Sequence, residues 1–160
     1  MAQRIECIEQ LLTTRTFDLV DVELSSGTET IKPVIAAARR CGARVILSFH
    51  DFKATPADEM LLAKIAAMIE SGADIAKIAC MPRELRDVLR LLEVTLKARE
   101  SYPEAALCTM SMGGMGCLSR VAGFLYGSDM SFAVGDKVSA PGQIPIEEAR
   151  RLAGTLLKYA

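Results

Sequence analysis

The stretch Gly72-Ala-Asp-Ile-Ala-Lys-Ile-Ala-Cys80 decides the fold, because it is a short apolar run with a lysine at its centre. Runs of this length and composition are typical of strands that are buried in a parallel sheet. Lys77 must either extend its ammonium group to water or lie in a dry site, where desolvation disfavours the charged form. The dry site would make the lysine a nucleophilic amine, the group that forms a Schiff base with a carbonyl substrate. A strand-end lysine with a solvated head is the structural alternative.

Short apolar segments alternate with longer helical patterns along the rest of the chain. Strands are expected at 18–24, 43–49, the Lys77 run, 106–112 and 132–135, and helices at 4–14, 29–41, 57–70, after Pro82, at 116–126 and from 146 onward. This order is one helix followed by five βα units, which requires a parallel sheet with right-handed crossovers. The predicted fold class is therefore α/β, either an open doubly wound sheet or part of a closed (β/α)8 barrel.

Polar side chains gather toward the carboxyl ends of the predicted strands. Period-two alternation places Asp21 and Glu23 on one face of the first strand, and Ser48 and His50 on one face of the second. Barrels and doubly wound sheets both hold their active sites at this edge. The structural alternatives are that the two carboxylates cap a neighbouring loop, and that His50, the only histidine, is hydrogen-bonded scaffolding.

The composition describes an ordinary globular domain and excludes several classes of function. The 160 residues are 51% hydrophobic and carry 19 basic and 20 acidic side chains, so neither a nucleic acid nor a membrane surface is expected as partner. Gly113-Gly-Met-Gly116 lacks the spacing of a nucleotide-binding loop. The five cysteines form no CxxC pair, which argues against a zinc site or a disulfide framework, and Cys80 and Cys117 are expected to be buried thiols.

Five sequence blocks, in this order and at these spacings, make the chain similar to the type I 3-dehydroquinate dehydratases. No single block is specific, but the combination is, and it runs through nearly the whole chain. The blocks are Ser48-Phe-His-Asp-Phe52 with Thr55-Pro56, Gly72-Ala-Asp-Ile-Ala-Lys-Ile-Ala79, Thr109-Met-Ser-Met-Gly113, Ser119-Arg120 and Ser139-Ala-Pro-Gly-Gln143.

The resemblance implies the fold, the activity and the partners. Residues 1–160 would be a single domain, the carboxy-terminal part of a (β/α)8 TIM barrel that is left incomplete at about five βα units. The activity would be that of a Schiff-base lyase, which dehydrates 3-dehydroquinate to 3-dehydroshikimate in the shikimate pathway of aromatic amino-acid biosynthesis. The family implies no cofactor and no metal, 3-dehydroquinate as the small-molecule partner, a homo-oligomer, specifically a dimer, and a cytoplasmic location.

The resemblance also implies two catalytic residues. Lys77 matches the lysine whose neutral amine adds to the ring ketone, so that the iminium withdraws electrons from the neighbouring carbon. His50 matches the general acid and base that forms and hydrolyses the imine and takes the proton from that carbon. Histidine suits this role because it ordinarily exchanges protons near neutral pH.

The remaining family positions bind the substrate. Arg120 matches the residue that grips the substrate carboxylate through the bidentate fork of its guanidinium, although an arginine on a helix is usually solvated or ion-paired. Ser139 and Gln143 match polar contacts on a loop over the pocket. Met112 and Phe52 match wall residues.

The chain departs from the family at its start. Family members open with three further βα units, whereas Met1 falls in what would be the helix before the fourth strand. Five strands of a barrel leave two open edges, so we expect association with a second copy or with a separate amino-terminal piece, and slow turnover without it. Two alternatives stay open: an aldolase-like barrel that uses the same lysine, and a non-catalytic fragment that only assembles with another chain.

Overall fold

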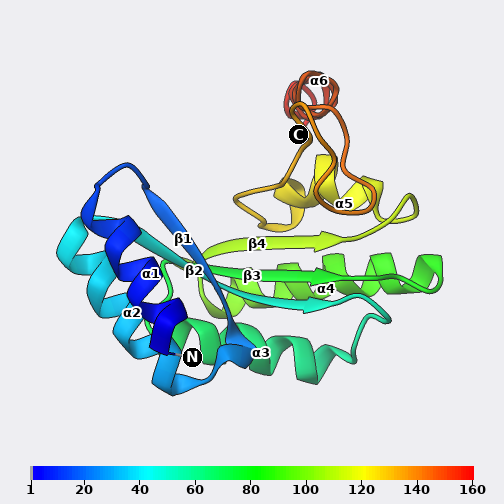
Figure 1. Cartoon of the computed structure of the whole chain (residues 1–160). Coiled ribbons are helices and arrows are strands. Elements are labelled where there is room, and N and C mark those ends of the chain that lie inside the picture. Colours follow the sequence, from blue (N-terminus) through cyan, green and yellow to red (C-terminus); the bar gives the residue numbers. More distant parts are fainter. Residues whose placement is uncertain (1) are drawn as a thin grey trace.

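The computed structural model describes residues 2–160 and contains one parallel sheet with helices packed on it (Figure 1). The four strands lie in chain order: β1 (Leu19–Glu23), β2 (Arg44–Asp51), β3 (Ile75–Cys80) and β4 (Ala106–Ser111). The helices are α1 (Ala2–Thr13), α2 (Thr28–Cys41), α3 (Asp58–Glu70), α4 (Leu85–Ser101), α5 (Cys117–Ala122) and α6 (Ile146–Leu157), with short 3-10 helices at Leu24–Ser26 and Gly123–Tyr126.

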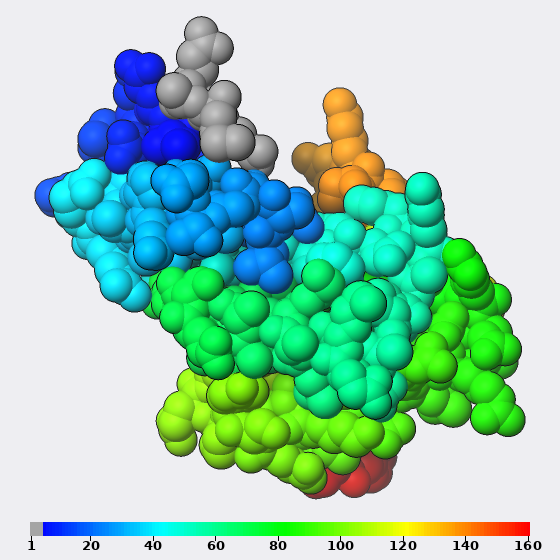
Figure 2. All heavy atoms as spheres, turned by 90° about the horizontal axis from the view of Figure 1, so that it is seen from below, coloured from blue at the N-terminus to red at the C-terminus, as the bar shows by residue number. Residues whose placement is uncertain are grey.

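The helices α2, α3 and α4 cover the same face of the sheet (Figure 1). Seen from that side, the segments form successive bands in the order of the chain (Figure 2). Strands that follow one another without a reversal, joined by right-handed crossovers, place all their helices on one face, as in a (β/α)8 barrel. A doubly wound sheet reverses its strand order and carries helices on both faces. The arrangement is that of an incomplete TIM barrel.

Alternation along the strands separates two cores. The outward-facing side chains pack under the helices and include Val22, Leu47, Ile78 and Leu107. The inward-facing side chains form a second, smaller cluster, which comprises Ile46, Ile75, Ala79, Cys108, Met110 and Met112. The inner face therefore combines an apolar floor with the polar residues Asp21, Glu23, Ser48, His50 and Lys77, which share its register.

The predicted fifth strand at 132–135 is wrong. Val134 forms only an isolated bridge with Pro145, across its own loop. The reason lies at the free edge of β4, where side-chain oxygens already accept the backbone N–H groups that point away from β3. The Leu107 N–H donates to Asp129 at 2.7 Å, the Thr109 N–H to Ser128 at 3.0 Å and the Ser111 N–H to Ser119 at 2.8 Å. With these donors satisfied, the edge has no N–H groups left to pair with another strand.

The other predicted elements are confirmed within a few residues, with one adjustment. The helix expected at 116–126 divides into α5 and the 3-10 turn Gly123–Tyr126. Within residues 2–160, no helix combines the length and the apolar character needed to cross a membrane. Nor does this part of the chain bring three or more His, Cys, Asp or Glu side chains into an arrangement that could hold a metal ion.

The buried-thiol prediction holds for Cys80 and is wrong for Cys117. Burial, together with the nearby Asp51 carboxylate, raises the pKa of the Cys80 thiol to about 12. Cys117 is exposed because it begins the short helix α5, where no element covers it. Burial likewise raises the pKa of Cys108, on the inner face, to about 12.

These environments predict which cysteines react with iodoacetamide at pH 8. With a pKa of about 12, roughly one Cys80 or Cys108 thiol in ten thousand is ionised at that pH. Peptide mapping should therefore find the exposed Cys7 and Cys117 alkylated and the two buried thiols intact. All five cysteines should react in denaturant. Alkylation of Cys108 at the rate of Cys7 would contradict the burial of its thiol.

Candidate active site

The sheet register brings the polar side chains of three strands into one cluster. Glu23, Ser48 and Lys77 are lateral neighbours on β1, β2 and β3. Asp21 lies two residues earlier on β1 and His50 two residues later on β2, so all five side chains point to the inner face. Parallel pairing in register is therefore what assembles the cluster from segments up to 56 residues apart.

Lys77 is buried and carries a partner. Only 8% of the residue is exposed, and its Nζ donates to Asp21 Oδ2 at 2.7 Å. The ammonium also lies 4.4 Å from the centre of the Phe132 ring, a cation–π distance. Burial of the lysine agrees with one of the two alternatives drawn from the sequence, and the structure adds a carboxylate partner that the sequence did not predict.

Glu23 holds His50 at two points. Its Oε1 accepts the His50 backbone N–H at 3.1 Å, and its Oε2 lies 2.7 Å from the ring Nδ1. A carboxylate at Nδ1 favours the tautomer that carries its hydrogen there, which leaves Nε2 as the free ring nitrogen. The Phe52 ring stacks on the imidazole with 5.9 Å between centroids. His50 is therefore oriented by its neighbours and keeps one nitrogen available.

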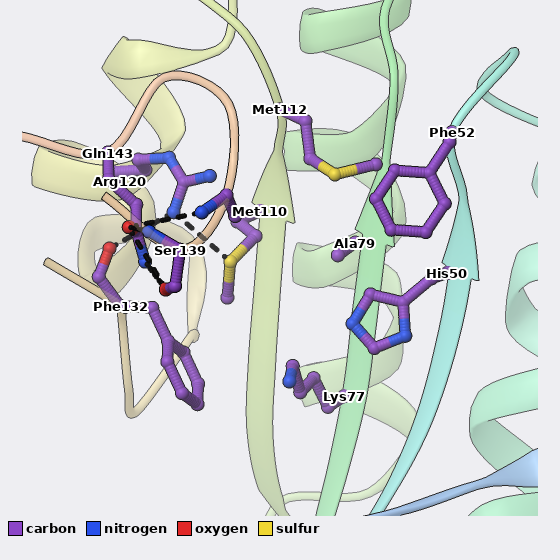
Figure 3. A pocket seen from close by; sticks show the side chains of 11 residues that line it. His50, Phe52, Lys77, Ala79, Met110, Met112, Arg120, Phe132, Ser139 and Gln143 are labelled. Atoms are coloured by element: carbon purple, nitrogen blue, oxygen red, sulfur yellow. Dashed lines mark hydrogen bonds between the residues drawn. The ribbon is translucent and has the colours of Figure 1, made fainter. Parts of the chain in front are cut away.

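A cavity of about 220 Å³ opens over this cluster (Figure 3). His50 and Lys77 lie on neighbouring strands on one side of it, and Arg120 with the loop around Ser139 lies on the other (Figure 3). All the residues predicted as catalytic, substrate-binding or wall residues line this one cavity. They are His50, Phe52, Lys77, Met112, Arg120, Ser139 and Gln143, joined by Ala79, Met110, Phe132 and Ala140.

Arg120 is a buried cation that pairs with no carboxylate among the described residues. Only 6% of it is exposed; its Nη1 donates to the Phe132 carbonyl and its Nη2 to the Pro141 carbonyl, both at 3.0 Å. The buried Nε has no partner within the described part of the chain. Burial lowers the pKa of the guanidinium, yet arginine stays charged in proteins. A buried positive charge without a counter-ion is suited to an anionic ligand.

The loop that carries Ser139 and Gln143 is closed by its own hydrogen bonds. Gln143 Oε1 accepts the backbone N–H of Ser139 at 2.8 Å, and Gln143 Nε2 donates to the Ser139 hydroxyl at 3.0 Å. Gly142 has a φ of +75°, and a Cβ there would lie 2.2 Å from the Gly113 carbonyl oxygen. Only glycine allows this close approach of the two loops. The loop is thereby seated over the cavity.

Sequence reasoning missed two contributions to the site. The sequence predicts a strand at Phe132, and the contact of this ring with Lys77 spans 55 positions that no local pattern connects. The sequence predicts the face on which Ser48 lies, but the hydrogen bonds of this serine to two carboxylates depend on the lateral register of β1 and β2. Alternation within one strand predicts the face of the sheet on which a side chain lies. No local pattern predicts which residues of two strands are paired.

Comparison with known proteins identifies the family to which the chain belongs. The family model for type I 3-dehydroquinase matches residues 1–158. The chain belongs to the type I 3-dehydroquinase family. Among its relatives, the 3-dehydroquinate dehydratase of Geobacillus thermodenitrificans is 45% identical over 99% of this chain, and that of Aromatoleum aromaticum is 48% identical over 87% of it. The chain covers 61% and 53% of those relatives, so it spans little more than half of their length.

Solved structures agree with this membership of the type I 3-dehydroquinase family. The 3-dehydroquinate dehydratase of Geobacillus kaustophilus superposes with a TM-score of 0.96 at 42% identity, over 99% of this chain and 61% of that one. The type I enzyme of Clostridium difficile, solved with covalently modified comenic acid, gives 0.94 at 39% identity over 99% of this chain and 63% of that one. The four strands thus occupy positions of a family barrel.

Arg120 should hold the 131–146 segment in place. Replacement by methionine removes two hydrogen bonds from a charged donor, each worth about 1.5–3 kcal/mol, so amide exchange in this segment should accelerate at least about tenfold. Hydrogen-exchange mass spectrometry measures it. Arg150→Met, which removes only an exposed ion pair with Glu147 on α6, is the matched control and should leave the segment unchanged. Equal exchange in all three proteins would contradict this role.

Proposed function

We propose that this chain acts on 3-dehydroquinate as a Schiff-base-forming lyase and releases 3-dehydroshikimate. The observation that supports it most strongly is the placement of a buried lysine and an oriented histidine on one side of a cavity, with a buried arginine on the other. These three residues match the family positions for imine formation, proton transfer and carboxylate binding. The substrate carries the matching groups, a ketone, a carbon-bound hydrogen beside it and a carboxylate.

The first step requires Lys77 as a free amine. Asp21 Oδ2, at 2.7 Å, is the nearest carboxylate oxygen to the ammonium and is suited to receive its proton. The amine adds to the substrate ketone and gives a carbinolamine, which loses water to become the protonated imine. The positive nitrogen then withdraws electrons from the adjacent carbon. Phe132, over which Nζ lies, stabilises the cationic forms of this nitrogen.

His50 carries the next two proton transfers. Its free Nε2 takes the proton from the carbon beside the imine, and the electron pair left behind forms an enamine. The imidazolium returns that proton to the β-hydroxyl, which leaves as water while the ring double bond forms. Hydrolysis of the imine regenerates Lys77 and releases the product. Proton transfer by a positioned group of this kind contributes about 10²–10⁴-fold in rate.

Arg120 is proposed to orient the substrate. Its guanidinium is directed by two carbonyl groups, while the unpartnered Nε and the uncompensated charge favour a carboxylate at the cavity wall. Ser139 and Gln143 would exchange their mutual hydrogen bonds for substrate hydroxyls. Positioning by such contacts supplies much of the rate in a site that has few reacting groups.

Association is proposed for the open side of the sheet. β1 pairs only with β2 within the described residues, and beside it lies an apolar groove lined by Ile8, Leu11, Leu12 and Phe17. An open strand edge with an apolar border favours pairing with another chain. We propose a homodimer, a cytoplasmic location, and correspondence of this single domain to the carboxy-terminal part of the family barrel. The open groove also favours a second candidate, an assembly fragment without catalysis.

Borohydride trapping tests the proposed function. Incubation with 3-dehydroquinate and sodium borohydride should add the mass of the reduced substrate to the chain, because the imine is reduced to a stable amine. Intact-mass spectrometry detects the adduct, and peptide mapping should place it on Lys77. Lys77→Ala should give none, whereas Lys53→Ala, which removes an exposed lysine, should react as the unaltered chain does.

The same sample separates the two candidates. Sedimentation velocity should report a dimer that carries the adduct. A folded oligomer with an unreactive Lys77 would reject the lyase and favour the assembly fragment. An adduct that survives Lys77→Ala would assign the chemistry to another amine.

A further inference from the structure

Four hydrogen bonds connect the two proposed catalytic residues through the inner face. Lys77 Nζ donates to Asp21 Oδ2 at 2.7 Å, and Asp21 Oδ1 accepts from the Ser48 hydroxyl at 2.6 Å. The same hydroxyl lies 3.1 Å from Glu23 Oε2, which in turn lies 2.7 Å from His50 Nδ1. The path is continuous and crosses three strands. The proposed chemistry uses Asp21 to accept the lysine proton and Glu23 to orient the histidine, but it gives the Ser48 hydroxyl no part.

Ser48 is the centre of this path. The residue is 1% exposed, and its hydroxyl has one hydrogen for two carboxylate oxygens. The hydrogen is therefore shared unequally, with the larger share on the closer Asp21. When the positive charge of Lys77 beside Asp21 is removed, the Asp21 carboxylate attracts the shared hydrogen more strongly, and the Glu23 carboxylate, which then accepts less from Ser48, interacts more strongly with His50. A change in the charge of Lys77 therefore changes the proton affinity of the His50 imidazole.

We propose that Ser48 is a positioning residue whose hydroxyl couples the Lys77–Asp21 pair to the Glu23–His50 pair, so that the protonation of the lysine and of the histidine are linked. The proposal rests on the proposed function for its catalytic meaning. The linkage itself, between Lys77 and His50 through the Ser48 hydroxyl, does not require substrate. In the reaction, the linkage would carry to His50 each change of charge at the Lys77 nitrogen, between ammonium, amine and iminium.

Charged side chains surround His50 on several of the elements packed near it. Glu23 of β1 contacts its ring, Lys77 of β3 and Arg120 of α5 line the same cavity, and Asp21 of β1 holds Lys77. Lys64 of α3 lies over the Phe49 ring, 4.1 Å from its centre, on the opposite face of β2. Asp51 accepts the backbone N–H groups of Lys53 and Ala54 in the following turn.

The only histidine of the chain provides the readout. Nitrogen-15 NMR of the ring reports the tautomer and the titration of His50 without assignment against other histidines. Lys77→Met removes a positive charge, so the His50 midpoint should move to higher pH by about half a unit or more, a threefold gain in proton affinity. In a Ser48→Ala background the same substitution should move the midpoint by less than half as much, because only the through-space effect of the charge remains.

Ser111→Ala is the matched control. Ser111 is a fully buried serine on β4 whose hydroxyl has no partner among the described residues. Its removal should leave the response to Lys77→Met unchanged. Equal midpoint shifts with and without the Ser48 hydroxyl would overturn the proposal, as would no shift in the unaltered background or a reduced shift in Ser111→Ala. Since no substrate is present, these outcomes are independent of borohydride trapping, which alone decides the lyase chemistry.

Discussion

The site depends on the ion pair between Lys77 and Asp21, because a charge on the inner face of the sheet needs a partner. The lysine is 8% exposed, and the carboxylate that holds it belongs to the strand two positions away in the sheet. The pair therefore forms only when β1, β2 and β3 are in register. The register of the strands therefore also fixes the position of the proposed nucleophile, Lys77.

A second constraint acts from the other side of the cavity. Arg120 joins α5 to the loop through the carbonyl groups of Phe132 and Pro141, and Gly142 seats that loop against Gly113. The same segment supplies Asp129 and Ser128, which close the edge of β4. One stretch of irregular chain thus covers the cavity, fixes the arginine and ends the sheet. A lysine, a histidine and an arginine are held on opposed walls by short-range contacts.

The sequence predicted the four strands, their helices and the catalytic, substrate-binding and wall residues first named for the site, because these depend on period-two alternation, cap residues and a recognisable set of blocks. Three features escaped it for a common reason. The failed strand at 132–135, the exposure of Cys117 and the contact of Phe132 with Lys77 are all decided by distant neighbours. The side-chain oxygens that accept the β4 N–H groups compete with pairing by a further strand, and no local sequence pattern predicts which of the two forms. The pairing of Lys77 escaped for the same reason, since the sequence left a solvated head and a dry site as alternatives and the strand register supplies a carboxylate.

A double-mutant cycle on Lys77 and Asp21 measures this dependence most directly. Urea unfolding would be followed for Asp21→Asn, Lys77→Met and the double variant. Asp21→Asn should destabilise the fold by leaving a buried ammonium without its carboxylate, and the double variant should recover most of that loss. The expected coupling is about 1 kcal/mol or more, below the 3–5 kcal/mol typical of fully buried pairs, because the Asp21 side chain is 35% exposed. Additive losses, with no coupling between the two positions, would contradict the account.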